Sequence, residues 1–175
     1  RLLAMAKTDD LPWLLALVSA LPAKYPAESA RAILVPLAKN PNSALRQAVG
    51  QAIGRLAQAP LLPALLDLAH DTQPEVRLRA AEALGGFPDE RALLALVTLL
   101  GDPASGLTRQ AATASLVAMA AHFPVDEHLA SALTDSVADR RLHAALVAIG
   151  IGSYRHATIL AKQLPVEQRP ENLAA

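Results

Sequence analysis

The sequence predicts an all-α protein, a solenoid in which antiparallel helix pairs repeat along the chain. Three observations support this prediction. Apolar residues recur at helical spacing through most of the chain, no segment has the β-branched alternation of a strand, and a unit of about 31 residues recurs. Self-similarity at this period predicts stacked helix pairs, each in contact with its neighbours in sequence.

The composition narrows the possible functions. Hydrophobic residues make up 53% of the 175 residues but aromatic residues only 3%, which suits close helix–helix packing. Sixteen basic residues balance sixteen acidic ones, and this argues against a general attraction to nucleic acid or anionic membranes. The absence of cysteine excludes disulfides, thiolate metal ligands and a cysteine nucleophile.

The best-defined unit runs from Asp71 to Asp102. Pro74 is placed to begin its first helix, and Gly85-Gly86 is predicted to end that helix in the left-handed conformation that helix C-termini favour. A second helix is predicted over 89–100, closed by Gly101. The apolar face of the first helix consists of Val76, Ala80, Ala83 and Leu84.

The other elements follow from caps, prolines and apolar spacing. Before this unit, helices are predicted over 11–21, 27–39, 44–57 and 60–69, and Pro36 should bend the second or end it early. After it, helices are predicted over 107–121 and 124–133, in a segment ending at Gly150, and over 154–164. We expect residues 1–164 to form one domain and residues 165–175 to be a frayed or disordered tail.

Neighbouring copies align on this unit. Arg46, Ala52 and Gly54 fall 31 residues before Arg77, Ala83 and Gly85, and Arg109 falls 32 residues after Arg77. A fourth copy lies near Arg140-Arg141, with its register uncertain by one residue.

The pattern D-x-x-x-x-V-R-x-x-A-A-x-A-L-G, here Asp71 to Gly85, resembles the HEAT repeat, and most closely the short variety found in phycobilisome bilin lyases. The resemblance covers about residues 27–164 and is strongest over 40–102. It implies a right-handed superhelix of about four or five repeats.

In that family the motif aspartate lies in the turn, the motif arginine lies on the second helix of a unit, and the two tie neighbouring units together. The family's second helix is the helix that carries the motif arginine, which is the one that opens the Asp71–Asp102 unit described above. Carried over by position, this structural ladder pairs Asn40 with Arg46, Asp71 with Arg77, Asp102 with Arg109, and Asp135 with Arg141. The first rung has no carboxylate and the third is one residue longer. An arginine fork can bind a carboxylate and nearby carbonyls together, so we expect these arginines to be structural.

The resemblance also implies that the second helices line the concave side of the solenoid. Their solvent-facing positions are then the candidates for binding a protein or peptide. The candidates are Gln47, Gln51, Leu78, Arg79, Glu82, Gln110, Leu142 and His143.

Sites for metals and catalysis are not predicted. His122 and His128 flank Asp126-Glu127, a set that could bind a divalent ion, but no i, i+4 histidine pair fixes its geometry and a solvated loop is favoured. No nucleophile elbow, glycine-rich phosphate loop or tight carboxylate pair is present. Trp13 is expected in the core or in a terminal contact. We predict no metal and no cofactor.

The leading hypothesis is therefore a non-catalytic interaction module, a preformed surface for a protein or peptide partner. One alternative is a subunit of, or accessory to, an enzyme of the bilin lyase kind. Another is nucleic-acid binding along Arg79, Arg109 and Arg140-Arg141, which the balanced charge disfavours.

Two further expectations concern the context of the chain. No apolar run is long enough to cross a bilayer and no signal pattern opens the sequence, so we expect a cytoplasmic protein without membrane association. The chain opens with Arg1, and we expect it to be a fragment or processed product of a longer array; apolar solenoid ends, including Leu2, Leu3 and Met5, would allow self-association.

Overall fold

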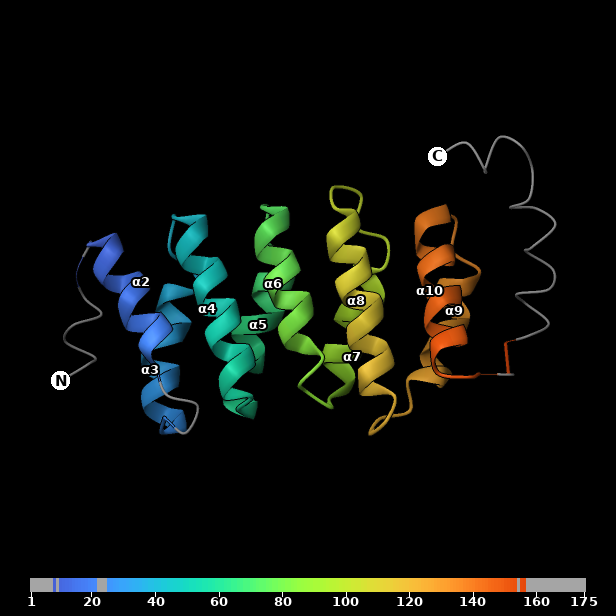
Figure 1. The fold of residues 1–175 in the computed structure, drawn as a ribbon, viewed down its shortest axis with the longest axis horizontal. Coiled ribbons are helices and arrows are strands. Elements are labelled where there is room, and N and C mark those ends of the chain that lie inside the picture. The colour runs from blue at the N-terminus through green and yellow to red at the C-terminus, as the bar shows by residue number, and fades with distance from the viewer. Residues whose placement is uncertain (1–7, 9, 22–24, 154, 157–175) are drawn as a thin grey trace.

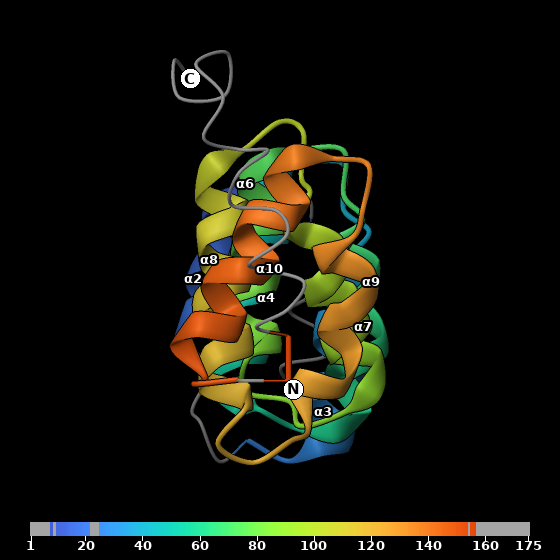
Figure 2. The same cartoon turned by 90° about the vertical axis from the view of Figure 1, so that its right-hand side faces the viewer.

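The molecule consists of two rows of helices, and consecutive helices, one from each row, form antiparallel pairs (Figure 1). The computed structural model describes Thr8 and residues 10–21, 25–153 and 155–156. Helices α2, α4, α6, α8 and α10 stand side by side in one row, and α3, α5, α7 and α9 lie behind them (Figure 1). The end-on view shows the two rows as two layers (Figure 2). Successive helices of the chain alternate between the two layers, as expected of a solenoid of helix pairs.

Most element bounds are close to those that the sequence predicts, but the helix predicted over 124–133 is a 3₁₀ helix over Val125–His128 followed by an α-helix over Leu129–Leu133 only. The helices are α2 (Leu11–Ala20), α3 (Ala27–Leu37), α4 (Ser43–Leu56), α5 (Leu62–Ala69), α6 (Pro74–Leu84), α7 (Glu90–Leu99), α8 (Gly106–Met119), α9 (Leu129–Leu133) and α10 (Ala138–Gly150). Two short 3₁₀ helices, η1 (Ala59–Leu61) and η2 (Val125–His128), precede α5 and α9.

Helices α2, α4, α7 and α8 begin at short polar side chains that cap them. Asn42 accepts hydrogen bonds from the backbone N–H groups of Ala44 and Leu45, and Ser105 accepts one from Thr108. Such caps satisfy donors that have no partner within the helix. Pro36 lies inside α3, which ends one residue later, so the predicted early end of that helix is observed.

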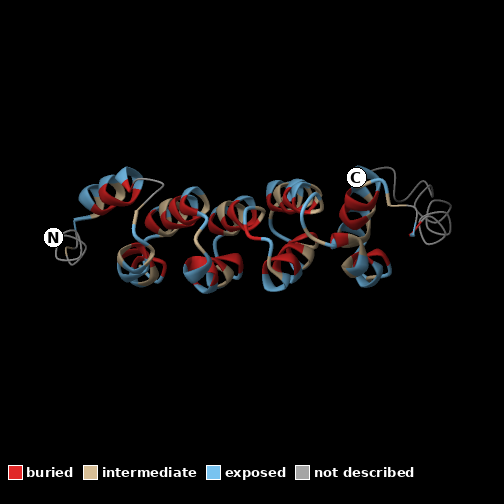
Figure 3. Cartoon of the chain, turned by 90° about the horizontal axis from the view of Figure 1, so that it is seen from below, coloured by how far each residue is buried: buried red, intermediate tan, exposed pale blue. Residues whose placement is uncertain are grey.

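The core is a continuous apolar layer between the two rows (Figure 3). Its largest fully buried side chains are leucine and isoleucine, and alanines such as Ala52, Ala80 and Ala112 lie among them without exposure. Phe87 is buried, whereas Trp13 is 40% exposed, so of the two locations expected for Trp13, the core is wrong. Burial of aliphatic side chains is the main stabilising force of this fold.

The predicted left-handed end at Gly85-Gly86 is also wrong. Gly85 is right-handed, and among the described residues positive φ angles occur only at Ala57 and Gly152. Gly85 is needed for close packing: a Cβ there would lie 2.9 Å from the Cβ of Ser115 on α8. Gly54 is equivalent, since its Cβ would lie 2.9 Å from that of Ala83 on α6. Glycine therefore sets how closely consecutive helices of the front row approach.

The all-α solenoid is confirmed. The predicted tail over 165–175, most of the predicted helix over 154–164, and Leu2, Leu3 and Met5 lie outside the described residues. Ser153, which directly precedes that predicted helix, donates a hydrogen bond to the carboxylate of Asp126. Within the part of the chain that the structure describes, no helix combines the length and apolarity needed to cross a bilayer.

Candidate functional site

Arginine–aspartate pairs join consecutive units at the turns before the second helices. Arg46 donates from Nε and Nη2 to Asp71, at 2.6 and 2.8 Å, and Arg77 donates in the same way to Asp102, at 2.5 and 2.9 Å. The Nη1 group of each arginine donates to carbonyls of its own turn, at Asn40 and Asp71 respectively. Each guanidinium therefore ties two units together, with the bidentate geometry that gives the strongest carboxylate contacts.

The pairing differs from the predicted ladder by one unit. Each arginine reaches the carboxylate of the following unit and only the backbone of its own, so Asn40 with Arg46 and Asp71 with Arg77 are not side-chain pairs. This offset explains the missing carboxylate at Asn40. The residue 31 positions before Arg46 is Leu15, which offers no guanidinium. Asp71 also accepts a hydrogen bond from the backbone N–H of Gln73. Asn40 has this second role, because its amide oxygen accepts the backbone N–H of Asn42.

The third and fourth rungs are different. Arg109 donates to the carbonyl of Asp102 and lies 3.4 Å from Asp139, while Asp135 is held by Arg140 at 2.6 Å. Among the described residues, the buried Nε of Arg109 has no acceptor. Arg109 therefore makes no bidentate contact with the next aspartate, Asp135. One extra residue separates Arg109 from Asp102, and Asp135 is paired with Arg140 instead.

Arg141, not Arg140, is the fourth equivalent of the motif arginine. Its Nη1 donates to the carbonyls of Asp135 and Ser136, as Arg77 donates to those of Asp71 and Thr72. This contact resolves the one-residue ambiguity of the sequence alignment.

The electrostatics of the rungs favour ionised aspartates. Burial would raise the pKa of Asp102, but hydrogen bonds from Arg77 and from the N–H of Ala104 outweigh it and hold this pKa below its ordinary value. The same balance, with Arg46 as donor, lowers the pKa of Asp71. A lowered pKa in the folded state stabilises the fold above the ordinary value of about 4, and this contribution is lost as the pH falls through the folded pKa.

The predicted binding residues lie on four helices of one row, but not all face solvent. We call the outer side of α4, α6, α8 and α10 the second-helix face. Its exposed members are Gln51, Glu82, Gln110 and Leu142, and its half-buried members are Gln47, Leu78 and Arg79.

A groove between α4 and α6 gathers three of these residues. Gln51, Arg79 and Glu82 line a depression of about 470 Å³, together with Arg55 and a floor of Gly54, Ala83 and Gly86. Arg79 donates to Glu82 from Nη1 at 2.9 and 3.3 Å. Arg55, which sequence reasoning missed, donates to the carbonyls of Val18 and Ser19 at the end of α2. Its spacing of four residues from Gln51, which puts both side chains on one side of the helix, was the available signal.

The placement of His143 on a binding surface is wrong. His143 is only 9% exposed and packs between α10 and α8, where its Nδ1 lies 3.0 Å from the Thr113 hydroxyl. That hydroxyl donates its one hydrogen to the Arg109 carbonyl, so the imidazole donates from Nδ1. Burial first, and then the charge of Arg109, lower the pKa of His143 against the opposing effect of Asp139.

This burial makes stability pH-dependent. The unfolded chain binds a proton to His143 more readily than the folded one, so the free energy of unfolding should fall as the pH drops from the ordinary histidine pKa of about 6.5. We expect His143→Gln, which keeps a donor for Thr113, to lose less stability than the parent between pH 7 and pH 5. Urea unfolding of both proteins at pH 7, 6 and 5 measures the difference; parallel losses would contradict the assignment.

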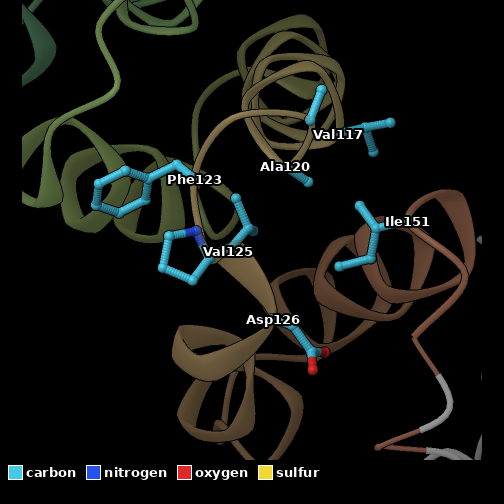
Figure 4. A pocket seen from close by; sticks show the side chains of 8 residues that line it. Val117, Ala120, Phe123, Val125, Asp126 and Ile151 are labelled. Carbon is cyan, nitrogen blue, oxygen red and sulfur yellow. The ribbon is translucent and has the colours of Figure 1, made fainter.

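A second pocket lies at the corner of α8, η2 and α10 (Figure 4). It measures about 350 Å³, and Val117, Ala120, Phe123, Val125 and Ile151 give it an apolar wall, with Asp126 at one side. No sequence motif indicated it, because its residues come from a helix, a turn and a later helix end.

The histidine and carboxylate groups near this pocket are bound to the protein itself. Asp126 accepts the Ser153 hydroxyl, and His156 Nε2 lies 2.8 Å from the Asp126 carbonyl and 3.2 Å from its carboxylate. The serine contacts the carboxylate and not the imidazole, so these three groups do not form a nucleophile–base pair. Within the described residues, no cluster of three potential metal ligands occurs.

Together, the stacked helix pairs and the arginine rungs define a helical-repeat scaffold. A model of HEAT repeats matches residues 31–118 and, in an overlapping match, residues 62–150. The chain belongs to the HEAT repeat family, which confirms the resemblance seen in the sequence.

Solved structures with a similar fold include two informative ones. A chain of the complex of CpcE and CpcF of phycocyanin lyase from Nostoc sp. PCC7120 matches with a TM-score of 0.64 and 18% identity, over 97% of this chain and 70% of that one. An engineered protein matches with a TM-score of 0.59 and 21% identity, over 95% of this chain and 85% of the other. At these identities the likeness concerns the fold. Comparison with curated proteins finds no significant match.

Proposed function

We propose that the chain is a non-catalytic module that binds a protein or peptide on its second-helix face. The observation that carries this proposal is the groove between α4 and α6, an open depression of about 470 Å³ that Gln51, Arg79 and Glu82 line. The Arg46–Asp71 pair joins the turns before α4 and α6, and the Arg77–Asp102 pair joins the turns before α6 and α8. Both helices that line the groove are therefore fixed to their neighbours. A preformed surface of this kind loses little conformational freedom when it binds.

The chemistry of the face suits a protein partner. Its amides, its ion pair and the exposed leucines Leu142 and Leu146 combine polar and apolar contacts, as protein interfaces do. Of the arginines considered for nucleic acid, Arg109 binds the Asp102 carbonyl and Arg140 binds Asp135. Arg79 lies beside Glu82, whose negative charge would repel a chain of phosphates. These contacts favour the protein-binding proposal over the nucleic-acid one.

Capture of a partner from a lysate of the organism that encodes the chain tests the proposal. The triple variant Gln51→Ala, Arg79→Ala, Glu82→Ala removes the groove side chains, and Arg91→Ala on α7 is the matched control in the other row. We expect a protein that the parent and the control retain and that the triple variant loses. Equal retention by all three proteins would reject the second-helix face as the binding surface.

A role beside a bilin lyase is the second candidate, suggested by the fold shared with a chain of the CpcE–CpcF complex. This role would not require catalytic groups on the chain itself. Co-expression with a bilin and its acceptor protein measures it: pigment absorbance transferred to the acceptor only when the chain is present would support it, and unchanged absorbance would count against it.

A further inference from the structure

The groove between α4 and α6 holds two guanidinium groups with unused donors. Arg79 makes both of its hydrogen bonds to Glu82 from Nη1, and Arg55 makes both of its bonds to Val18 and Ser19 from Nη2. A guanidinium carries five N–H donors. Considering the described residues, Nε and the second terminal nitrogen of each arginine therefore have no protein acceptor.

Small residues line the groove beside these donors. Gly54, Ala83 and Gly86 are among its lining residues, and a Cβ added at Gly86 would have only the Ala83 carbonyl oxygen within 4 Å, at 3.5 Å. The exposed side of Gly86 therefore leaves room for an incoming peptide. Gln51, exposed on α4, adds an amide that can donate to or accept from a peptide group.

The charge of the groove selects an anion of low charge. Arg55 and Arg79 contribute two positive charges and Glu82 one negative charge, so one positive charge remains uncompensated. Glu82 already shows that a carboxylate can sit on Arg79. A single carboxylate completes the balance, whereas a dianionic phosphate would place excess negative charge beside Glu82.

We propose that this groove binds a carboxylate of the partner chain, with Arg79 and Arg55 as donors and Gln51 beside the partner's backbone. The proposal rests on the proposed function and names the chemistry of its ligand. The carboxylate is that of an aspartate or glutamate side chain, which can present its two oxygens to a guanidinium fork while the peptide backbone on either side of it lies beside Gln51. Binding should weaken as salt is added, because the groove is open to solvent.

Nuclear magnetic resonance titration of the whole chain tests the proposal with defined probes. The first is acetyl-Gly-Glu-Gly-amide, its neutral match is acetyl-Gly-Gln-Gly-amide, and triglycine with an acetylated N-terminus supplies a terminal carboxylate only. We expect the Gly54 and Gly86 amides and the Arg79 Nε–H to shift with the glutamate peptide, and not with the glutamine peptide or the acetylated triglycine. Equal shifts from the glutamate and glutamine peptides would overturn the proposal.

Variants locate the binding and identify the charge. Arg79→Ala should abolish the shifts of the groove amides, while Glu82→Gln should tighten binding about threefold by removing the competing carboxylate. Arg91→Ala, whose arginine pairs with Asp89 outside the groove, should bind as the parent does. Parent-like binding by Arg79→Ala would place the carboxylate elsewhere and refute the assignment. Tighter binding of acetyl-Gly-phosphoserine-Gly-amide than of the glutamate peptide would do the same.

Failure of this proposal is distinguishable from failure of the proposed function. If the triple groove variant loses the captured partner but no carboxylate peptide shifts the groove signals, the surface binds a protein through other groups and only the carboxylate assignment fails. If the triple variant retains the partner as well, the second-helix face itself is rejected.

Discussion

Replacing Arg77 with alanine should destabilise the fold by about 3 kcal/mol, because it leaves the Asp102 carboxylate without its counter-charge. The Asp102 side chain is only 1% exposed and accepts both guanidinium bonds, at 2.5 and 2.9 Å. The carbonyls of Asp71 and Thr72 lose their donor at the same time. For a chain of this length, we expect the melting temperature to fall by roughly 6–12 °C.

The matched control lies on the same helix. Arg79 and Glu82 are 36% and 47% exposed, so Arg79→Ala should change the stability by no more than about 0.5 kcal/mol. Thermal unfolding of parent, Arg77→Ala and Arg79→Ala, followed by circular dichroism, separates the two roles. Equal melting shifts in the two variants would contradict the structural role of the Arg77–Asp102 rung.

Replacing Gly85 with valine should have the other large effect. The new Cβ would lie 2.9 Å from the Cβ and Oγ of Ser115 and 3.2 Å from its Cα, so α6 and α8 must move apart. Overpacking of this kind costs about 2–3 kcal/mol, even though valine is a better helix former than glycine. The midpoint of urea unfolding should fall accordingly.

Gly86 is the control for this substitution. It is exposed, a Cβ there would meet only the Ala83 carbonyl oxygen at 3.5 Å, and its φ is not positive. Gly86→Val should therefore unfold at nearly the parent's urea concentration. If both variants lose the same stability, the cost would come from the backbone at the helix end and not from the contact with Ser115.

The helical periodicity and the caps predicted most of the fold, because each depends on residues close together in sequence. The exceptions involve contacts between units. Gly85 has the sequence signature of a left-handed helix end, yet Ser115, thirty positions later, decides its role. The ladder register was missed for the same reason, since a spacing of six residues from Asp71 to Arg77 does not reveal that the carboxylate belongs to the preceding arginine.

The candidate site was predictable in part. Equivalent positions along the repeat correctly predicted that Gln51, Arg79 and Glu82 lie on one surface. The same alignment predicted that His143 faces solvent, whereas the structure buries it against Thr113. Repeat alignment assigns equivalent positions along the chain but does not show which neighbouring helix covers each side chain, and for this reason it misplaced His143.

Site-specific crosslinking tests the central claim, partner recognition by the second-helix face, most directly. A photoreactive amino acid is placed at Gln51 in the groove and, in a separate protein, at Arg91 in the other row. After irradiation in a lysate, the probe at position 51 should form a covalent adduct with one protein, through a defined peptide, and the probe at position 91 should not. Adducts with that protein only from position 91, or the same adducts from both positions, would contradict the account.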